Sequence, residues 1–331
     1  MATSSPDRIS EALSRLNIRP RDEADDPRIV AIRNDARPWL PPISVTEYRW
    51  QADPANSSPG DFTERWVAEM DGEVLGLYLL SKMSWIERKN TFAGNIGIDH
   101  GHRGRGVGSA LFNHLMDRAT AEGATRLYGQ VSAEEEAAAT FLEHRGFAKT
   151  GRAARMSRLV IAEANLEGYE GVVDRLREGG IEIRTREEVG PDNEPAMRAI
   201  HALNTRAGQD IPSSEAFTGP PFEDFMRWLN SPGNSPDQCW IAYDHDRPVG
   251  YASVSRRGDD SSFNNFTAVD RDYRGRGIAR AVKLKTVEWA QANGIKIMFT
   301  ANDYENKPML SINIPLGYVE VPADLEVMRD L

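Results

Sequence analysis

The stretch Asn264–Ala290, NNFTAVDRDYRGRGIARAVKLKTVEWA, combines three local patterns in direct succession. Phe266–Val269 is a short apolar run of strand type. Asp270–Gly277 is rich in Arg and Gly, as a tight turn is, and Ile278–Ala290 has apolar residues at the three- and four-residue spacing of an amphipathic helix. The sequence therefore predicts a strand, a glycine-rich turn and a helix in this order.

This order of elements makes an anion site from backbone groups. The first N–H groups of a helix have no intrahelical partner, and the helix dipole places partial positive charge there. Gly275 and Gly277 leave room for a phosphate to approach those groups, while Arg274 and Arg276 add formal charge. The turn is a candidate phosphate site, and an ordinary helix start with solvent-facing arginines is the alternative.

The same construction occurs a second time, in FAGNIGIDHGHRGRGVGSALFNHL at Phe92–Leu115. Its Arg103–Gly106 matches Arg274–Gly277 at an offset of 171 residues. The same offset separates two further sets of landmarks, Gly123 from Gly294 and Gly146-Phe147 from Gly317-Tyr318. A repeat of this period is too long for a solenoid, so we predict two domains of one type.

Length and composition agree with this prediction. A chain of 331 residues suggests about two domains. The net charge of −10 disfavours a nucleic acid or an anionic membrane as partner. No apolar run approaches the roughly 18 residues that span a membrane, and the N-terminal residues lack the apolar core of a secretion signal. We expect a soluble, cytoplasmic protein with a small anionic ligand.

Metal binding and disulfide formation are not expected. Cys239 is the single cysteine, and it lies in the apolar run CWIAY, where a buried structural thiol is favoured over a nucleophile. The six His residues show no ligand spacing, so we predict no metal site.

The pattern along the chain predicts the order β-α-α-β-β-β-α-β-α-β in each half, which is a mixed α/β arrangement. We expect a first domain at 1–161, a charged connecting helix at 162–179 and a second domain at 180–331. The two helices after the glycine turns are predicted to cover Arg103–Glu122 and Gly275–Asn293, and Tyr318–Met328 to form the terminal strand.

In element order and turn sequence the chain resembles the GNAT superfamily of N-acyltransferases. In that family an R/Q-x-x-G-x-G/A turn between a strand and a helix binds the pyrophosphate of acetyl-CoA. Arg103-x-x-Gly106-x-Gly108 and Arg274-x-x-Gly277-x-Ala279 both match. The likeness covers nearly the whole chain and implies two tandem GNAT-type domains, each a mixed central sheet flanked by helices, in a layout similar to mycothiol synthase.

The resemblance implies acetyl-CoA, or another acyl-CoA, as cofactor. Ile98 and Val269 lie where the family's strand pairs with the pantetheine arm. The implied pyrophosphate contacts are Arg103, Gly104, Arg105, Gly106, Val107 and Gly108 in the first half and Arg274, Gly275, Arg276, Gly277, Ile278 and Ala279 in the second. Asn302 and Asn306 lie where many members place an asparagine that contacts the cofactor, whereas the first half has Val131 and the acidic run Glu134–Glu136.

The implied reaction is attack of a neutral amine on a thioester carbonyl, which needs a base, a donor for the oxyanion and an acid for the thiolate. The family's acid is often a Tyr four residues before the "GF" glycine, where this chain has Leu142 and Asn313. The strands before the turns carry Asn95 and Thr267 rather than a carboxylate. Tyr304, in the loop after the next strand, is a candidate acid, with a plain loop Tyr as the alternative.

Candidates for the base and the acceptor contacts are weaker. Asp259 and Asp260 precede the second strand and are candidate bases, although an Asp pair in such a loop is also typical of a solvated turn. The resemblance makes Trp228 and Phe217 candidate acceptor contacts, while the aromatic cluster that contains Trp228 is also typical of a core or a pocket wall.

These observations predict an acetyl-CoA-dependent N-acetyltransferase acting on the amine of a small molecule or peptide. The second half is the expected catalytic half because only it keeps Asn302 and Asn306, although the complete motif of the first half leaves cofactor binding there open. A CoA-binding sensor or scaffold without turnover is one alternative, and a second domain that serves as a partner or dimer surface is another. We expect a monomer or homodimer.

Overall fold

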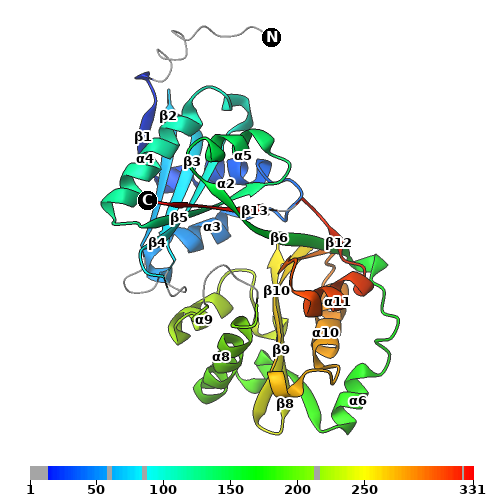
Figure 1. Ribbon diagram of the computed structural model, residues 1–331. Coiled ribbons are helices and arrows are strands. Elements are labelled where there is room, and N and C mark those ends of the chain that lie inside the picture. The colour runs from blue at the N-terminus through cyan, green and yellow to red at the C-terminus, as the bar shows by residue number, and fades with distance from the viewer. Residues whose placement is uncertain (1–13, 58–61, 84–87, 212–216, 323) are drawn as a thin grey trace.

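The computed structural model describes residues 14–57, 62–83, 88–211, 217–322 and 324–331. Figure 1 shows two halves, one above the other, each built on a sheet with helices against it. This is the predicted fold class, an α/β arrangement of two tandem domains.

The first half follows the predicted order of elements. Its elements are β1 (Asn17–Pro20), α2 (Asp26–Asp35), α3 (Val45–Ala52), β2 (Thr63–Met70), β3 (Glu73–Lys82), β4 (Thr91–Ile98), α4 (Val107–Ala121), β5 (Arg126–Ser132), α5 (Glu136–Glu143) and β6 (Ala148–Val160). The short helix α6 (Val172–Glu178) follows in the predicted connecting segment.

The second half repeats that order with one small helix and one small strand added. Its elements are β7 (Ile181–Thr185), α7 (Arg186–Val189), α8 (Glu194–Gly208), α9 (Phe222–Leu229), β8 (Cys239–Asp244), β9 (Arg247–Arg257), β10 (Ser261–Val269), α10 (Ile278–Ala292), β11 (Ile297–Asp303), α11 (Lys307–Leu316), β12 (Val319–Glu320) and β13 (Asp324–Asp330).

The two helices after the glycine turns begin later than predicted, at Val107 rather than Arg103 and at Ile278 rather than Gly275. The reason is the left-handed backbone of the turn glycines. In the second turn φ is 78° at Gly275 and 87° at Gly277, which is incompatible with an α-helix. Apolar periodicity carries no information on this backbone conformation, so the predicted start of each helix lay too early, inside the turn.

The described strands other than β12 form one hydrogen-bonded path in the order β1-β2-β3-β4-β5-β13-β6-β11-β10-β9-β8-β7, and β12 pairs with β6 beside it. β13, from the second half of the sequence, lies between β5 and β6 in the sheet of the first half, and Figure 1 shows it as a red strand in the upper part. β6 in turn pairs along Ala154–Val160 with β11 of the second half. Each half thus supplies a strand that the other half's sheet uses, and the predicted domain limits stay a prediction.

Helices cover both faces of each sheet. In the second half, Figure 1 shows α8 and α9 on one face and α10 on the other. Ile278 and Val282 of α10 pack with Val249 and Ala252 of β9 in a fully buried cluster. Cys239 is buried as predicted, and burial raises the pKa of its thiol to about 12.

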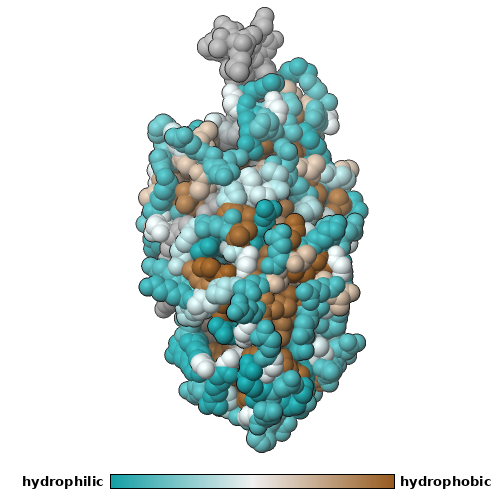
Figure 2. All heavy atoms as spheres, turned by 90° about the vertical axis from the view of Figure 1, so that its right-hand side faces the viewer, coloured by the Kyte–Doolittle hydropathy of each residue, from teal (hydrophilic) through white to brown (hydrophobic). Residues whose placement is uncertain are grey.

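The surface in Figure 2 is mostly hydrophilic, with apolar residues gathered at mid-height and below. Ile314 of α11 and Val319 of β12 are among the large apolar side chains exposed on the protein. Within the described residues, no helix has both the length and the apolar character needed to cross a bilayer.

Candidate active site

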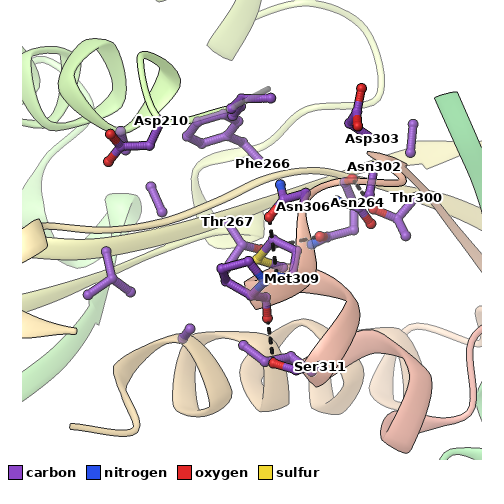
Figure 3. Close-up of a pocket in the computed structure, with 18 of the residues that line it drawn as sticks. Asp210, Asn264, Phe266, Thr267, Thr300, Asn302, Asp303, Asn306, Met309 and Ser311 are labelled. Atoms are coloured by element: carbon purple, nitrogen blue, oxygen red, sulfur yellow. Dashed lines mark hydrogen bonds between the residues drawn. The ribbon is translucent and has the colours of Figure 1, made fainter. Parts of the chain in front are cut away.

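A cavity of about 770 Å³ opens where β10 and β11 separate. These parallel strands pair only from Ser261 and Ile297 to Asn264 and Thr300. Beyond this point the cavity runs from the second glycine turn to α11. Figure 3 shows Asp210 at one end, Asn302 and Asp303 at the other, and Phe266 and Thr267 between them.

The second turn has the conformation of an anion site. Gly275 and Gly277 both have positive φ, and a Cβ at Gly275 would meet nothing within 4 Å, so the space beside the backbone is open. The N–H of Ala281 makes a helical hydrogen bond, to the Gly277 carbonyl at 3.0 Å. The N–H groups of Ile278 and Ala279 precede it and therefore have no carbonyl one turn back in the helix. This arrangement fits a phosphate group.

Arg274 is held at the mouth of this turn by two contacts. Its Nε donates to the Val269 carbonyl at 3.2 Å, and its guanidinium is paired with Asp210 at the end of α8. Arg271 pairs with the same carboxylate. Hydrogen bonds from Arg271 and Arg274 lower the pKa of Asp210 to about 2, so this group is an anion throughout the physiological pH range.

Most of the predicted contacts of the second half line the cavity, namely Val269, Arg274, Gly275, Gly277, Ile278, Ala279, Asn302 and Asn306. Arg276 does not: its guanidinium donates to the Asp272 carbonyl at 3.3 Å and lies over the Tyr273 ring. Asn306 caps α11 by accepting from the Met309 N–H at 3.3 Å (Figure 3). Whether these residues bind a cofactor stays a prediction.

β10 contains a bulge at Asn265. Asn264 pairs with Val254 and Phe266 with Ser253, so Asn265 is left out of the backbone pairing, while its side chain hydrogen-bonds Ser255 Oγ of β9. Bulges interrupt the ladder and are frequent beside active sites, where they re-aim a side chain or end the pairing. Asn264, Asn265 and Phe266 all line the cavity.

A buried polar network fixes the bulge. Lys283 of α10 is fully buried, and its Nζ donates to Asn264 Oδ1 at 2.6 Å. Asn264 Nδ2 donates to the Ser253 carbonyl at 3.3 Å, and Thr300 Oγ1 donates to the Asn264 carbonyl at 3.2 Å. Burial lowers the pKa of Lys283 to about 7. Phe112 stands at the matching position of α4, 171 residues earlier.

The first half builds the same turn without the bulge. Gly104 and Gly106 have φ of 71° and 89°, and Val107 and Gly108 begin α4 as Ile278 and Ala279 begin α10. β4, which ends at Ile98, pairs with β3 without interruption.

The surroundings of the first turn also differ from those of the second. Arg103 is paired with Glu135 at 2.9 Å, beside Arg105 in the turn. A Cβ at Gly94 of β4 would lie 3.2 Å from Leu115, and one at Gly129 of β5 would lie 3.3 Å from Val327, so the strands are closely packed there. These first-half residues lie away from the cavity described above.

The structure does not bring the predicted acid and bases to the cavity. Tyr304 is 42% exposed, and its hydroxyl donates to Glu320 rather than facing the cavity. Asp260 pairs with Lys296 at 3.0 Å beside the opposite end of β10. The Asp259 carbonyl accepts from Arg256. Asp259 and Asp260 precede Asn265 by only six and five residues, but the extended strand β10 begins at Ser261 and so separates them from the bulge.

The predicted acceptor contacts also lie elsewhere, since Trp228 packs against the core under α9 and Phe217 packs over Gly208 of α8. Asn313, at the family's Tyr position, is buried and donates to Asn302 Oδ1 at 2.7 Å. It therefore orients Asn302. Among the described residues no group of His, Cys, Asp and Glu is placed to hold a metal ion.

Sequence reasoning missed the wall opposite the glycine turn. This wall is formed by Gln130 of β5 and by Asp324 and Glu326 of β13. Asp324 is 7% exposed and pairs through Oδ2 with Arg37 at 3.2 Å. Burial raises the pKa of Asp324 above its usual value, against the opposing charge of Arg37. No local signal places these residues here, because the composition of β13 does not indicate that it lies between β5 and β6.

The sequence profile of the acetyltransferase (GNAT) family matches residues 28–147 and 199–311. The chain belongs to the GNAT family. Each matched region contains one glycine turn, so the repeated turn marks two GNAT domains, and the protein is an acyltransferase by family.

Two curated GNAT relatives align with most of the chain. A mycothiol acetyltransferase from Saccharomonospora viridis is 24% identical over 317 residues, which are 92% of this chain and 96% of the relative. A mycothiol acetyltransferase from Thermobispora bispora is 25% identical over 258 residues, 76% of this chain and 80% of the relative.

Two solved structures share the tandem fold. A tandem GNAT protein from the clavulanic acid biosynthesis pathway has a TM-score of 0.74 at 19% identity and covers 95% of this chain and 98% of its own. A GCN5-related N-acetyltransferase from Sphaerobacter thermophilus has a TM-score of 0.69 at 17% identity, with 96% of both chains covered. At these identities the likeness concerns the fold.

Proposed function

We propose that this GNAT protein is an acetyl-CoA-dependent N-acetyltransferase whose second half carries the reaction. The observation that supports it is the cavity at the β10 bulge, which joins the glycine turn to a wall of polar side chains. The first half has the turn but a continuous β4. The acceptor is the amine of a small molecule or peptide.

The residues of the second turn fit the cofactor's phosphates. Gly275 and Gly277 give an open backbone cradle, and the N–H groups of Ile278 and Ala279 supply donors without a competing helical acceptor. Arg274 adds charge once it exchanges Asp210 for phosphate. When bound, acetyl-CoA supplies an acetyl group activated as a thioester.

The bulge orients the reacting end. Because Asn265 is left out of the backbone pairing between β9 and β10, the backbone N–H groups around it are the donors that would hold a carbonyl oxygen in place. The Lys283–Asn264 hydrogen bond keeps this segment rigid. Rigid placement of donors is the main way in which such a site stabilises developing negative charge.

A calorimetric titration of acetyl-CoA into the wild type, Gly106→Glu and Gly277→Glu tests the proposal. Both glycines have φ close to 90°, so the two variants carry the same backbone strain and control for one another. We expect Gly277→Glu to abolish binding at the second turn and all turnover. An inactive Gly106→Glu with a fully active Gly277→Glu would overturn the assignment to the second half, and absence of binding by the wild type would overturn the proposal.

A CoA-binding sensor is the second candidate, because Asn313 stands where the family often has its acid and Tyr304 faces Glu320. A screen of primary amines for release of free thiol separates the two functions. Release above the rate of thioester hydrolysis supports the enzyme, whereas binding without release supports the sensor. Light scattering with and without CoA decides between monomer and homodimer.

A further inference from the structure

The cavity has charges of opposite sign at its two ends. Arg274 and Arg280 lie at the glycine turn, where Arg274 is paired with Asp210, whereas Asp303, Asp324 and Glu326 line the far part. Glu305 lines the same part. A ligand that fills the cavity therefore meets arginines at the glycine turn and carboxylates at the opposite end.

Sheet register places three of these carboxylates on one face. Ala154 of β6 pairs with Asp303 on one side and with Asp324 on the other, so the three residues form a row across the strands. Residues directly opposite one another point to the same face. With about 5 Å between neighbouring strands, Asp303 and Asp324 are about 10 Å apart at Cα. Glu326, two residues further on β13, points to that face as well.

Two carboxylate oxygens of this wall lack a hydrogen-bond partner in the buried interior. They are Asp324 Oδ1 and Glu326 Oε1. Asp324 Oδ2 is already paired with Arg37, so Oδ1 is the atom that remains for a ligand. Buried acceptors without a donor are costly, so each calls for a physical reason, of which a catalytic role is one. Gln130, opposite Glu326 on β5, is neutral and adds no compensating charge.

We propose that Asp324 and Glu326 bind the ammonium group of the acceptor, which is a small cationic amine, and that Asp324 Oδ1 takes up its proton before transfer. This rests on the acetyltransferase function proposed above and names its substrate class. The ammonium nitrogen gives one proton to the carboxylate, which leaves a neutral amine with a free lone pair and a neutral carboxyl group.

The environment of Asp324 suits this proton transfer. Burial raises the pKa of its carboxyl group, which brings the group closer to an amine as a proton acceptor. Arg37 opposes this shift, and Asp303, Glu305 and Glu326 are the other charged groups on this part of the cavity. Because β13 lies in the sheet of the first half, the acceptor site is built from both halves.

The test uses three amines, each with a neutral counterpart of the same shape: putrescine with 1,4-butanediol, glucosamine with glucose, and 2-phenylethylamine with 2-phenylethanol. Each is titrated calorimetrically into the full-length protein saturated with CoA. We expect at least one amine to bind and its neutral counterpart to bind at least tenfold more weakly.

Three variants assign the binding to named side chains. Asp324→Asn and Glu326→Gln should each weaken the amine at least tenfold and leave CoA affinity within twofold, which also shows that they fold. Asp330→Asn, the same change at the exposed far end of β13, should bind the amine as the wild type does. With a turned-over amine, Asp324→Asn should also lower kcat, whereas Glu326→Gln should act mainly on KM.

The outcomes separate the two proposals. Three outcomes overturn this inference alone. They are equal binding of an amine and its neutral counterpart, undiminished amine binding by both Asp324→Asn and Glu326→Gln, and no binding of any of the three amines to the CoA-loaded protein. Failure of CoA itself to bind the wild type overturns the proposed function.

Discussion

Replacement of Lys283 with Met should change how the free energy of unfolding depends on pH. Lys283 is fully buried under β10, with Asn264 Oδ1 as its hydrogen-bond acceptor and the Tyr318 ring 5.1 Å from Nζ. Desolvation lowers its pKa from the usual 10.5 to about 7. Methionine has a similar length and no titrating group, so it isolates this contribution.

The sign and size follow from proton linkage. Between about pH 7 and 10.5 the folded protein holds Lys283 neutral while the unfolded chain keeps it protonated. The unfolded state therefore binds more protons, and the wild type gains stability as pH rises through this window. At about 1.4 kcal/mol per pH unit, and with half-protonation near pH 7, the gain between pH 7 and 9 is about 2 kcal/mol. Below pH 7 both states are protonated and the contribution becomes constant.

The assay is urea unfolding followed by tryptophan fluorescence at pH 7, 8 and 9. The difference in unfolding free energy between wild type and Lys283→Met should shift by about 2 kcal/mol in favour of the wild type across this range. Lys285→Met removes the same charge from a residue of α10 that pairs with Glu288 at 2.8 Å, and serves as the control. Parallel pH profiles for Lys283→Met and the wild type would refute the reasoning.

Three further changes test the cavity and the sheet. Asp210→Asn should tighten acetyl-CoA binding several-fold, since the carboxylate that competes with phosphate for Arg271 and Arg274 loses its charge; calorimetry measures this, and weaker binding contradicts it. Deletion of Asn265 should give β10 the continuous register of β4. We expect kcat to fall at least 100-fold while the affinity for CoA stays within a few-fold of the wild type. Unchanged kcat would show that the bulge has no part in the reaction. Leu111→Ala, in the fully buried core under α4, should lower the unfolding free energy by about 2–5 kcal/mol in urea titrations, and a loss below 1 kcal/mol would mean that the site repacks.

The parts of the site that sequence predicted depend on local chemistry. Gly275 and Gly277 need no distant partner to form a turn, and the apolar spacing of α10 follows from the face that it buries. The internal repeat then gave a second, independent copy of each pattern. For this reason the order of elements and the position of both glycine turns were predicted correctly.

The parts that sequence missed depend on pairing between distant strands. Asn265 adds one residue to β10. Gly94 of β4 pairs with Leu80, and Asn264 of β10 pairs with the equivalent residue Val254. Equivalent residues before the bulge are therefore 170 positions apart, rather than the 171 that separate them after it. Apolar patterning cannot detect one added residue. Asp324 and Glu326 were missed because a strand's composition does not state which sheet accepts it.

The position of β13 has a consequence for the growing polypeptide at the ribosome. β5 and β6 of the first half leave the exit tunnel long before residues 324–330, which lie between them in the finished sheet, have been made. At about 5–20 residues per second, the intervening stretch takes on the order of ten seconds or more to translate. During that time the edges of β5 and β6 that flank the place of β13 are open to pairing with other nascent chains. The protein's demand for chaperones should therefore concentrate on its N-terminal half, during translation of its C-terminal half.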